Sequence, residues 1–260
     1  MAAIIESHFG LAEALGVLSG DVVSLVGAGG KTTILYGLVT ELRRLGLTVV
    51  ATTTTHTQAP ESPTTAPPIV FASEEKNWLQ SVRARLDRYG AVTVVGARKR
   101  EDKLQGLKPA EIDPLRGMAD CVVIEADGAR GRSLKAPASH EPAVPEWSTL
   151  TVVVAGMDVL GRRLSEDTVH RLAIVSELSG AAVGSPIVEE VVALAIVRGY
   201  LPTIPRGSRG VVFLNKVDDT RLRQAERVGE LLLEAGVPEV IFGEAIHPNG
   251  CFYQMTPSAE

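Results

Sequence analysis

The sequence predicts an α/β protein in which a mainly parallel sheet is flanked by helices. Short aliphatic runs alternate with longer segments of helical spacing, which is the pattern of strand–helix–strand units. Hydrophobic residues make up 45% of the 260 residues but aromatic residues only 4%. Val, Leu, Ile and Ala must therefore fill the core, as they do in parallel strands that are buried on both faces.

The elements follow from local patterns. Aliphatic runs predict strands at residues 22–26, 48–53, 91–95, 121–125, 151–155, 210–214 and 239–242. Helical spacing predicts helices at residues 32–45, 74–89, 166–179, 187–198 and 220–235. The stretch 58–68 is rich in Pro, Thr and Ala, so we expect a loop or mobile flap there.

Composition excludes several classes of protein. With 31 acidic and 26 basic residues the formal charge is −5, so no general attraction to nucleic acid or to a membrane surface is expected. The two cysteines, Cys121 and Cys251, lie too far apart to suggest a thiolate metal site or a disulfide framework. No segment reads as a signal peptide or a membrane span. We expect a cytoplasmic protein.

The first strand runs into a glycine-rich turn that opens a helix. This turn consists of Gly27, Ala28, Gly29, Gly30, Lys31, Thr32 and Thr33. Backbone N–H groups at such a turn can hold phosphate, a lysine can reach the terminal phosphates, and a threonine hydroxyl can ligate Mg²⁺. The usual loop has four residues between its first glycine and the Gly–Lys pair, whereas this one has two, similar to Mur ligases.

This motif predicts a P-loop NTPase-like fold and a nucleoside triphosphate as ligand. We expect one nucleotide-binding domain over residues 1–260, with a helical insertion at about 158–205. The alternative reading of the motif is a strand-to-helix turn whose lysine, Lys31, is only solvated.

A second motif follows the strand at 210–214. Asn215, Lys216 and Asp218 resemble the Asn-Lys-x-Asp signature of GTP-binding proteins. A carboxylate at Asp218 can accept hydrogen bonds from two guanine N–H groups, which adenine does not offer. The motif favours GTP over ATP as the bound nucleotide. Alternatively, Asp218 and Asp219 cap the helix that begins near Thr220.

Two carboxylates close the strand at 121–125. Glu125 and Asp127 come at the strand end, where parallel-sheet enzymes place acids against Mg²⁺. We expect at least one of them to act with Thr32 on the metal. The alternative is an Asp–Gly turn at residues 127–128.

Further candidates lie on neighbouring segments. Thr55 and His56 end a threonine-rich run after the second strand, where a hydroxyl can contact Mg²⁺ and an imidazole can act as a general base. Arg130 lies in a cationic segment that can contact a transferring phosphoryl group. Together with Lys31 and Asp127, His56 and Arg130 are the candidate catalytic residues, although ordinary strand residues and a solvated loop would look the same.

Several motifs together resemble those of one known family. They are the glycine-rich turn at 27–33, Thr-Thr-Thr-Thr-His at 52–56, Lys-Leu-Gln-Gly at 103–106, Glu-Ala-Asp-Gly-Ala-Arg-Gly-Arg at 125–132 with Leu-Lys-Ala-Pro-Ala after it, Val-His-Arg at 169–171 and Asn-Lys-Val-Asp at 215–218. These resemble the YqeC family of accessory proteins for selenium-dependent molybdenum hydroxylases. The resemblance implies a role in maturing such a hydroxylase or supplying its cofactor, and it assigns no catalytic residue.

Three hypotheses follow. The first is an NTP-dependent accessory protein, with GTP hydrolysis favoured, that serves a molybdenum hydroxylase or its maturation proteins. The second is an ATP-dependent kinase or Mur-like ligase that acts on a small acid. The third is a scaffold that senses a nucleotide without turning it over.

Overall fold

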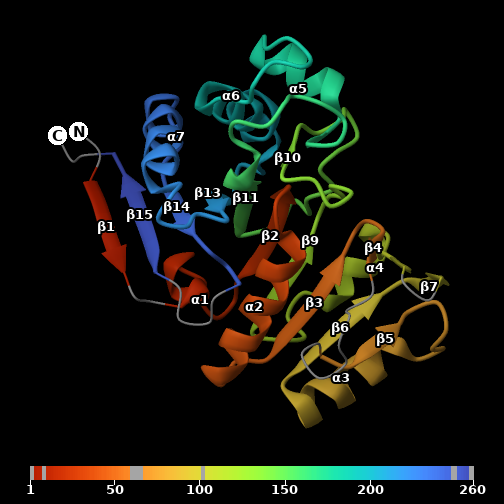
Figure 1. The fold of residues 1–260 in the computed structure, drawn as a ribbon. Coiled ribbons are helices and arrows are strands. Elements are labelled where there is room, and N and C mark those ends of the chain that lie inside the picture. Colours follow the sequence, from red (N-terminus) through yellow and green to blue (C-terminus); the bar gives the residue numbers. More distant parts are fainter. Residues whose placement is uncertain (1–2, 8–9, 59–66, 101–102, 247–250, 258–260) are drawn as a thin grey trace.

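A ten-stranded sheet forms the centre of the computed structural model, which describes residues 3–7, 10–58, 67–100, 103–246 and 251–257 (Figure 1). Its strands are β1 (Ala3–Ser7), β2 (Val22–Gly27), β3 (Val49–Thr53), β5 (Ile69–Phe71), β6 (Ala91–Val95), β9 (Cys121–Glu125), β11 (Leu150–Gly156), β13 (Arg209–Asn215), β14 (Val240–Gly243) and β15 (Phe252–Thr256). The spatial order is β1-β15-β14-β13-β11-β2-β9-β3-β6-β5. All neighbours from β14 to β5 are parallel, and β15 and β1 add antiparallel pairs at one edge.

Helices cover both faces of this sheet. They are α1 (Leu11–Ala14), α2 (Lys31–Arg44), α3 (Trp78–Tyr89), α4 (Pro109–Ile112), α5 (Leu172–Ser179), α6 (Glu189–Gly199) and α7 (Leu222–Glu234). Two apolar clusters result: one joins α1 and α2 to the sheet, and the other joins α3, α6 and α7 to the opposite face. Strand β2 lies between β9 and β11. Its residues Val23 and Val26 face opposite sides of the sheet and belong to different clusters. This is why the strand is aliphatic on both faces.

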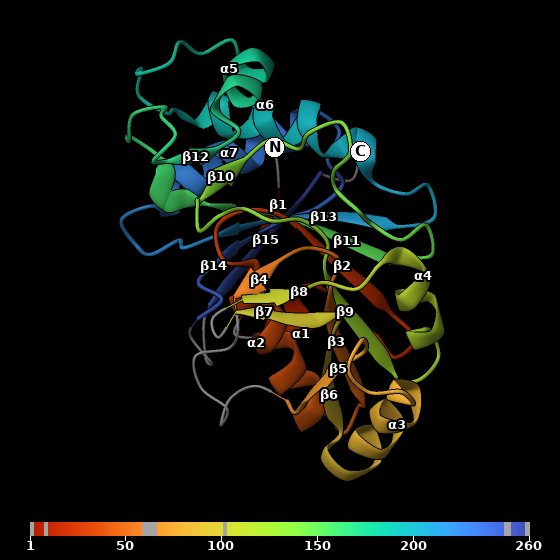
Figure 2. The ribbon, with the colours of Figure 1, turned by 90° about the vertical axis from the view of Figure 1, so that its right-hand side faces the viewer.

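Two smaller ladders lie outside the main sheet. A three-stranded sheet joins β4 (Thr57–Gln58), β8 (Lys103–Gln105) and β7 (Ala97–Arg100), and it faces the viewer in Figure 2. The chain after β8 returns to the end of β3, where the Leu107 N–H donates to the Thr53 carbonyl at 2.8 Å. Strand β10 (Leu134–Lys135) pairs in parallel with β12 (Val169–His170).

The mainly parallel α/β fold is confirmed. All seven expected strands are present, each within one residue of its expected ends. The helix expected at 166–179 begins only at Leu172, because Val169 and His170 pair with β10 instead. Of the loop expected at 58–68, Gln58 belongs to β4, and residues 59–66 lie outside the described part of the chain.

The segment 158–205 carries α5 and α6, and α6 packs against α7. That this segment is an insertion in a single domain stays a prediction. No helix in the described ranges is long and apolar enough to cross a membrane.

Candidate functional site

The glycine-rich turn links the end of β2 to the start of α2. Three of its backbone N–H groups donate to protein acceptors: Gly27 to Asp127 Oδ2 at 3.1 Å, Ala28 to the Val154 carbonyl at 2.8 Å and Gly29 to the Arg132 carbonyl at 3.0 Å. These amides are therefore engaged within the protein. Of the four amides from Gly27 to Gly30 that were expected to bind phosphate, the first three are therefore already hydrogen-bonded within the protein.

The next N–H groups remain open. Among the described residues none accepts a hydrogen bond from the backbone N–H of Gly30, Lys31, Thr32 or Thr33. The first N–H groups of a helix have no partner within the helix, and the positive end of the helix dipole lies there. The start of α2, a helix of 14 residues, is thus a site for an anion such as phosphate.

Close packing, rather than ligand space, explains two of the glycines. Gly27 has φ 91°, and a Cβ there would lie 2.2 Å from the Val154 carbonyl oxygen of β11. Gly30 has φ 121°, and a Cβ would lie 2.4 Å from Asn215 Nδ2. A side chain at either position would strain the backbone and collide with a neighbour. Packing against β11 and Asn215 therefore requires glycine at both positions.

Lys31 points back into the protein and is only 4% exposed. Its Nζ donates to the Gly27 carbonyl at 2.5 Å and lies 3.1 Å from Asp127 Oδ1. A buried ammonium group of this kind requires a counter-ion. Asp127 provides it.

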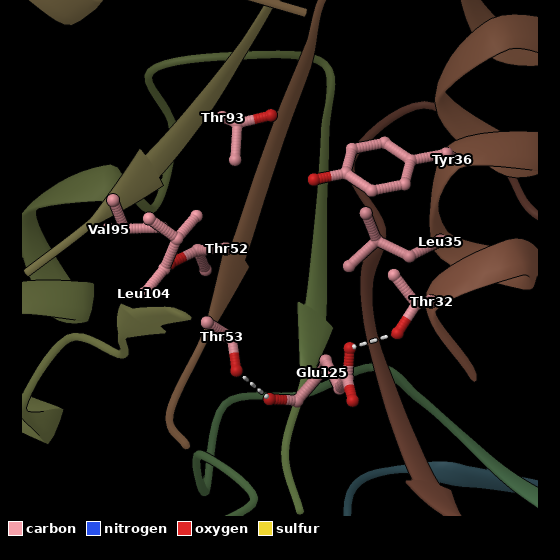
Figure 3. Close-up of a pocket in the computed structure, with 9 residues that line it drawn as sticks. All are labelled: Thr32, Leu35, Tyr36, Thr52, Thr53, Thr93, Val95, Leu104 and Glu125. Atoms are coloured by element: carbon pink, nitrogen blue, oxygen red, sulfur yellow. Dashed lines mark hydrogen bonds between the residues drawn. The ribbon is translucent and has the colours of Figure 1, made fainter. Parts of the chain in front are cut away.

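The two strand-end carboxylates have different surroundings. Asp127 is fully buried, and besides Lys31 and the Gly27 N–H it contacts Lys135 Nζ at 3.1 Å and the Tyr200 hydroxyl at 2.9 Å, both through Oδ2. Glu125 is 7% exposed, and its Oε2 accepts a hydrogen bond from Thr32 Oγ1 at 2.9 Å (Figure 3). Oδ2 of Asp127 thus accepts two hydrogen bonds, and Oδ1 faces Lys31 as an ion pair without accepting a hydrogen bond from a described residue. Glu125, by contrast, lies beside the hydroxyl at the start of α2.

A small pocket opens next to this pair. Figure 3 shows its lining: Thr32, Leu35, Tyr36, Thr52, Thr53, Thr93, Val95, Leu104 and Glu125. Burial, with a further contribution from the negative charge of Glu125, raises the pKa of Tyr36 to about 12 despite the opposing effect of Thr93. The hydroxyl of Tyr36 therefore stays protonated at neutral pH. The sequence expectations missed Tyr36, whose position four residues after Thr32 on the same helix is the available signal.

Metal-ligating groups are sparse at this site. Within the described ranges, no group of three or more His, Cys, Asp or Glu side chains lies close enough together to hold a metal ion. An ion at the start of α2 would thus depend on oxygen atoms from Thr32, Glu125 and the ligand itself. This is the way Mg²⁺ commonly binds with phosphates, through one or two protein oxygens.

The remaining candidates lie around the edge of the site. Thr55 is half-buried, with its Oγ1 3.4 Å from Thr53 Oγ1. His56 and Arg130 are exposed, and neither forms a hydrogen bond or an ion pair with another described side chain. Arg130 has φ 50°, an uncommon backbone conformation for a residue with a side chain. The structure does not join His56 or Arg130 to Lys31 and Asp127.

Asn215 connects three loops at the same edge of the sheet. Its side chain is buried, donates from Nδ2 to the Gly29 carbonyl at 2.7 Å and accepts the Ala245 N–H at Oδ1 at 3.0 Å. The turn after β2 and the loops after β13 and β14 are thereby tied together. The segment that carries Lys216 and Asp218 is consequently fixed next to the glycine-rich turn.

Lys216 and Asp218 both have partners within the protein. Lys216 Nζ contacts Ser133 Oγ at 2.9 Å and Asp158 Oδ2 at 3.0 Å. Asp218 is partly exposed, accepts the Thr220 N–H at 3.1 Å and pairs with Arg221. The hydrogen bonds from Thr220 hold the pKa of Asp218 below its ordinary value, and Arg221 contributes to the shift. Asp218 therefore stabilises the turn before α7. It does not cap that helix as the alternative reading expected, because the N-cap residue is Arg221.

Fold and site together define a P-loop NTPase-like α/β protein: a mainly parallel sheet, a glycine-rich turn after a central strand, and a lysine and a threonine at the start of the next helix. The chain belongs to the YqeC family. The family model "YqeC protein" matches residues 23–173. "Uncharacterized protein YqeC" of Escherichia coli (strain K12) is 35% identical over 199 residues, which cover 75% of each chain.

Among solved structures, the chain is similar to the hydrogenase maturation factor HypB from Archaeoglobus fulgidus. The identity is 14% and the TM-score 0.32, with 86% of this chain and 79% of that chain covered.

Proposed function

We propose that this chain binds a nucleoside triphosphate at the start of α2 and uses it, with GTP favoured, in an accessory role for a molybdenum hydroxylase. The observation that carries the proposal is the set of open N–H groups at Gly30–Thr33 beside Lys31. Their arrangement suits the terminal phosphates of a nucleotide. In the bound state Lys31 turns from Asp127 toward the phosphates.

Thr32 and Glu125 are the residues that would hold Mg²⁺. The 2.9 Å separation of their oxygens places two hard ligands beside the open N–H groups, which fits this ion. Magnesium supplies charge neutralisation on the phosphates. We assign Asp127 a different role, as the counter-ion of buried lysines, because its oxygens already face Lys31 and Lys135.

The preference for GTP depends on Asp218. Asn215 fixes the loop after β13 against the phosphate turn, which supports a base site there. To accept guanine N–H groups, Asp218 must exchange its contacts with Thr220 and Arg221 for the base. These contacts are close to solvent, where ion pairs are weak, so the exchange is feasible.

A binding titration tests the phosphate site. We expect Lys31→Met to weaken a fluorescent GTP analogue in the presence of Mg²⁺ by about 10- to 100-fold, since a hydrogen bond to a charged group contributes about 1.5–3 kcal/mol. Lys76→Met is the matched control, because Lys76 is exposed and lies before α3. Equal affinity for Lys31→Met and the parent protein would refute the site.

Base selection is tested separately. The parent protein should bind GTP more tightly than ATP. Compared with the parent protein, Asp218→Asn should bind GTP more weakly and xanthosine triphosphate more tightly. Asp219→Asn changes the adjacent exposed carboxylate and serves as control. If the parent protein binds ATP and GTP equally and Asp218→Asn does not bind xanthosine triphosphate more tightly, Asp218 only stabilises the turn and does not bind the base.

Product analysis separates the three classes of function. Release of phosphate from GTP without an acceptor supports hydrolysis. Turnover of ATP that requires an added small acid supports the kinase or ligase, for which the short Mur-like loop is the argument. Binding without turnover in a single-turnover assay with excess protein supports the sensing scaffold.

The accessory role comes from the family resemblance. We propose that the partner is a selenium-dependent molybdenum hydroxylase or one of its maturation proteins. Co-purification of a tagged chain with that hydroxylase, with and without GTP and Mg²⁺, tests this. If the amount of hydroxylase that co-purifies is the same with and without GTP, the result would contradict a nucleotide-dependent accessory role.

A further inference from the structure

Two lysines share the carboxylate of Asp127. Lys31 Nζ lies 3.1 Å from Oδ1, and Lys135 Nζ lies 3.1 Å from Oδ2. Asp127 and the side chain of Lys135 are completely buried, and Lys31 is nearly so. The Tyr200 hydroxyl donates to Oδ2 at 2.9 Å. A carboxylate in this position needs one counter-ion, and it has two.

Further ion pairs extend from Lys135. Its Nζ lies 2.9 Å from Glu141 Oε2 and donates to the Gly128 carbonyl at 2.7 Å. Glu141 in turn contacts Arg171 at 2.9 and 3.1 Å. Although burial acts to raise it, the hydrogen bonds from Arg171 and Lys135 hold the pKa of Glu141 at about 2. Glu141 is therefore charged at neutral pH.

We call this series of contacts the ion chain; its members are, in order, Lys31, Asp127, Lys135, Glu141 and Arg171. It contains three cations and two carboxylates. Removal of Lys31 leaves two charges of each sign, so the remaining part is balanced. The ion chain therefore has one positive charge in surplus, and Lys31 is the cation at the end of it that lies at the open N–H groups of α2.

We propose that Lys135 is a positioning residue: it is the permanent counter-ion of Asp127, and it thereby allows Lys31 to leave Asp127 for a bound phosphate. The inference rests on the proposed function. A buried carboxylate that loses its only counter-ion is strongly destabilised. With Lys135 in place Asp127 stays paired when Lys31 moves. Without Lys135, Asp127 retains Lys31.

The position of Lys135 supports this assignment. Pairing of β10 with β12 places Lys135 opposite His170, and Arg171 follows directly. Burial and the positive charges of Lys135, Arg171 and Arg130 lower the pKa of His170, so it adds no further cation at neutral pH. Lys135 Nζ donates to the Gly128 carbonyl and lies within ion-pair distance of Asp127 and Glu141. Because its side chain is fully buried among these protein oxygens, Lys135 acts through Asp127 rather than on a ligand.

The test compares Lys135→Met with the double variant Asp127→Asn/Lys135→Met. We expect Lys135→Met to bind the fluorescent GTP analogue at least tenfold more weakly, with unchanged affinity for guanosine, which lacks phosphates. The double variant, in which Lys31 has no charge to hold it, should recover affinity to within threefold of the parent protein. A merely structural role for Lys135 predicts no such recovery.

Arg171→Met is the matched control. It removes one positive charge from the same ion chain but does not contact Asp127, so affinity should fall less than threefold. If Arg171→Met lowered GTP affinity as much as Lys135→Met, the total positive charge near the site, rather than the contact of Lys135 with Asp127, would explain the loss. Equal GTP affinity of Lys135→Met and the parent protein, or equal losses in the single and double variants, would also overturn the inference.

Two further measurements keep the outcomes separate. If Lys135→Met fails to fold, Asp127→Asn alone is measured; it should bind triphosphate at least as tightly as the parent protein, and weaker binding contradicts the inference. If the parent protein binds no triphosphate, the proposed function fails. If the parent binds and Lys31→Met does not, while Lys135→Met binds normally, only the role of Lys135 fails.

Discussion

Replacement of Asn215 by Ala measures how firmly the glycine-rich turn is held. The change removes the donor to the Gly29 carbonyl and the acceptor of the Ala245 N–H. Gly29 is buried, so its unpaired carbonyl costs about 1–3 kcal/mol. Ala245 is half-buried, and loss of its hydrogen bond costs about 0.5–1.5 kcal/mol. We therefore expect the free energy of unfolding to fall by about 1.5–4.5 kcal/mol.

Urea unfolding without nucleotide, followed by circular dichroism, measures this change. Lys216→Met is the control: it neutralises the next residue, whose ion pair with Asp158 is partly exposed and contributes less than about 1 kcal/mol. A loss below about 1 kcal/mol for Asn215→Ala, or equal losses for the two variants, would refute the view that Asn215 is the main tie between these loops.

The other predictions concern three separate groups. Gly30→Ala should lower the melting temperature through its collision with Asn215, and the loss should shrink in an Asn215→Ala background; equal losses in both backgrounds contradict the collision. Glu141 has a depressed pKa of about 2, so its stabilisation of up to roughly 3 kcal/mol is present above about pH 4.5 and lost as the pH falls toward 2. Glu141→Gln should flatten the stability curve over that interval, and a curve of unchanged slope contradicts the assignment. Burial, with Asp21 and Asp120 nearby, raises the pKa of Cys121 to about 11, so iodoacetamide at pH 8 should spare Cys121 in the folded protein; mass spectrometry that finds it modified as fast as in urea contradicts this.

Burial on both faces explains which strands the sequence predicts. The central strands can be predicted from their aliphatic runs without knowing which strands lie beside them, because every residue of β2, β3, β6 and β9 is buried. Strand β15 lies between β1 and β14, is buried only at Phe252 and Met255 and includes Gln254, so its local pattern is weak. The two-residue strand β12 forms only by pairing with β10, which the local sequence does not show. Helical spacing therefore predicted a helix over these two residues.

The chemistry of the turn shows the same limit. Sequence pattern alone predicts an anion site where a glycine-rich turn opens a helix, but it does not show which N–H groups are engaged. The Ala28 N–H donates to Val154 because β11 lies beside β2, and this adjacency is a property of the sheet order. The burial of Lys135 likewise depends on pairing with β12, so a sequence reading treats it as one cation in a solvated loop.

The antiparallel edge formed by β1 and β15 has a consequence for synthesis of the chain. Ala3 pairs with Thr256, and Ser7 with Phe252, so β1 leaves the ribosome long before its partner exists. At about 5–20 residues per second the delay is roughly 12 to 50 s. Strand β14 (Val240–Gly243) lacks its neighbour β15 for a much shorter time, from its own synthesis until that of Phe252–Thr256, and its unpaired backbone groups are open to other chains in that interval. Strand β1 is therefore the segment that stays unpaired through most of synthesis, and chaperones that bind extended segments would meet it early, whereas the edge of β14 is open only near the end.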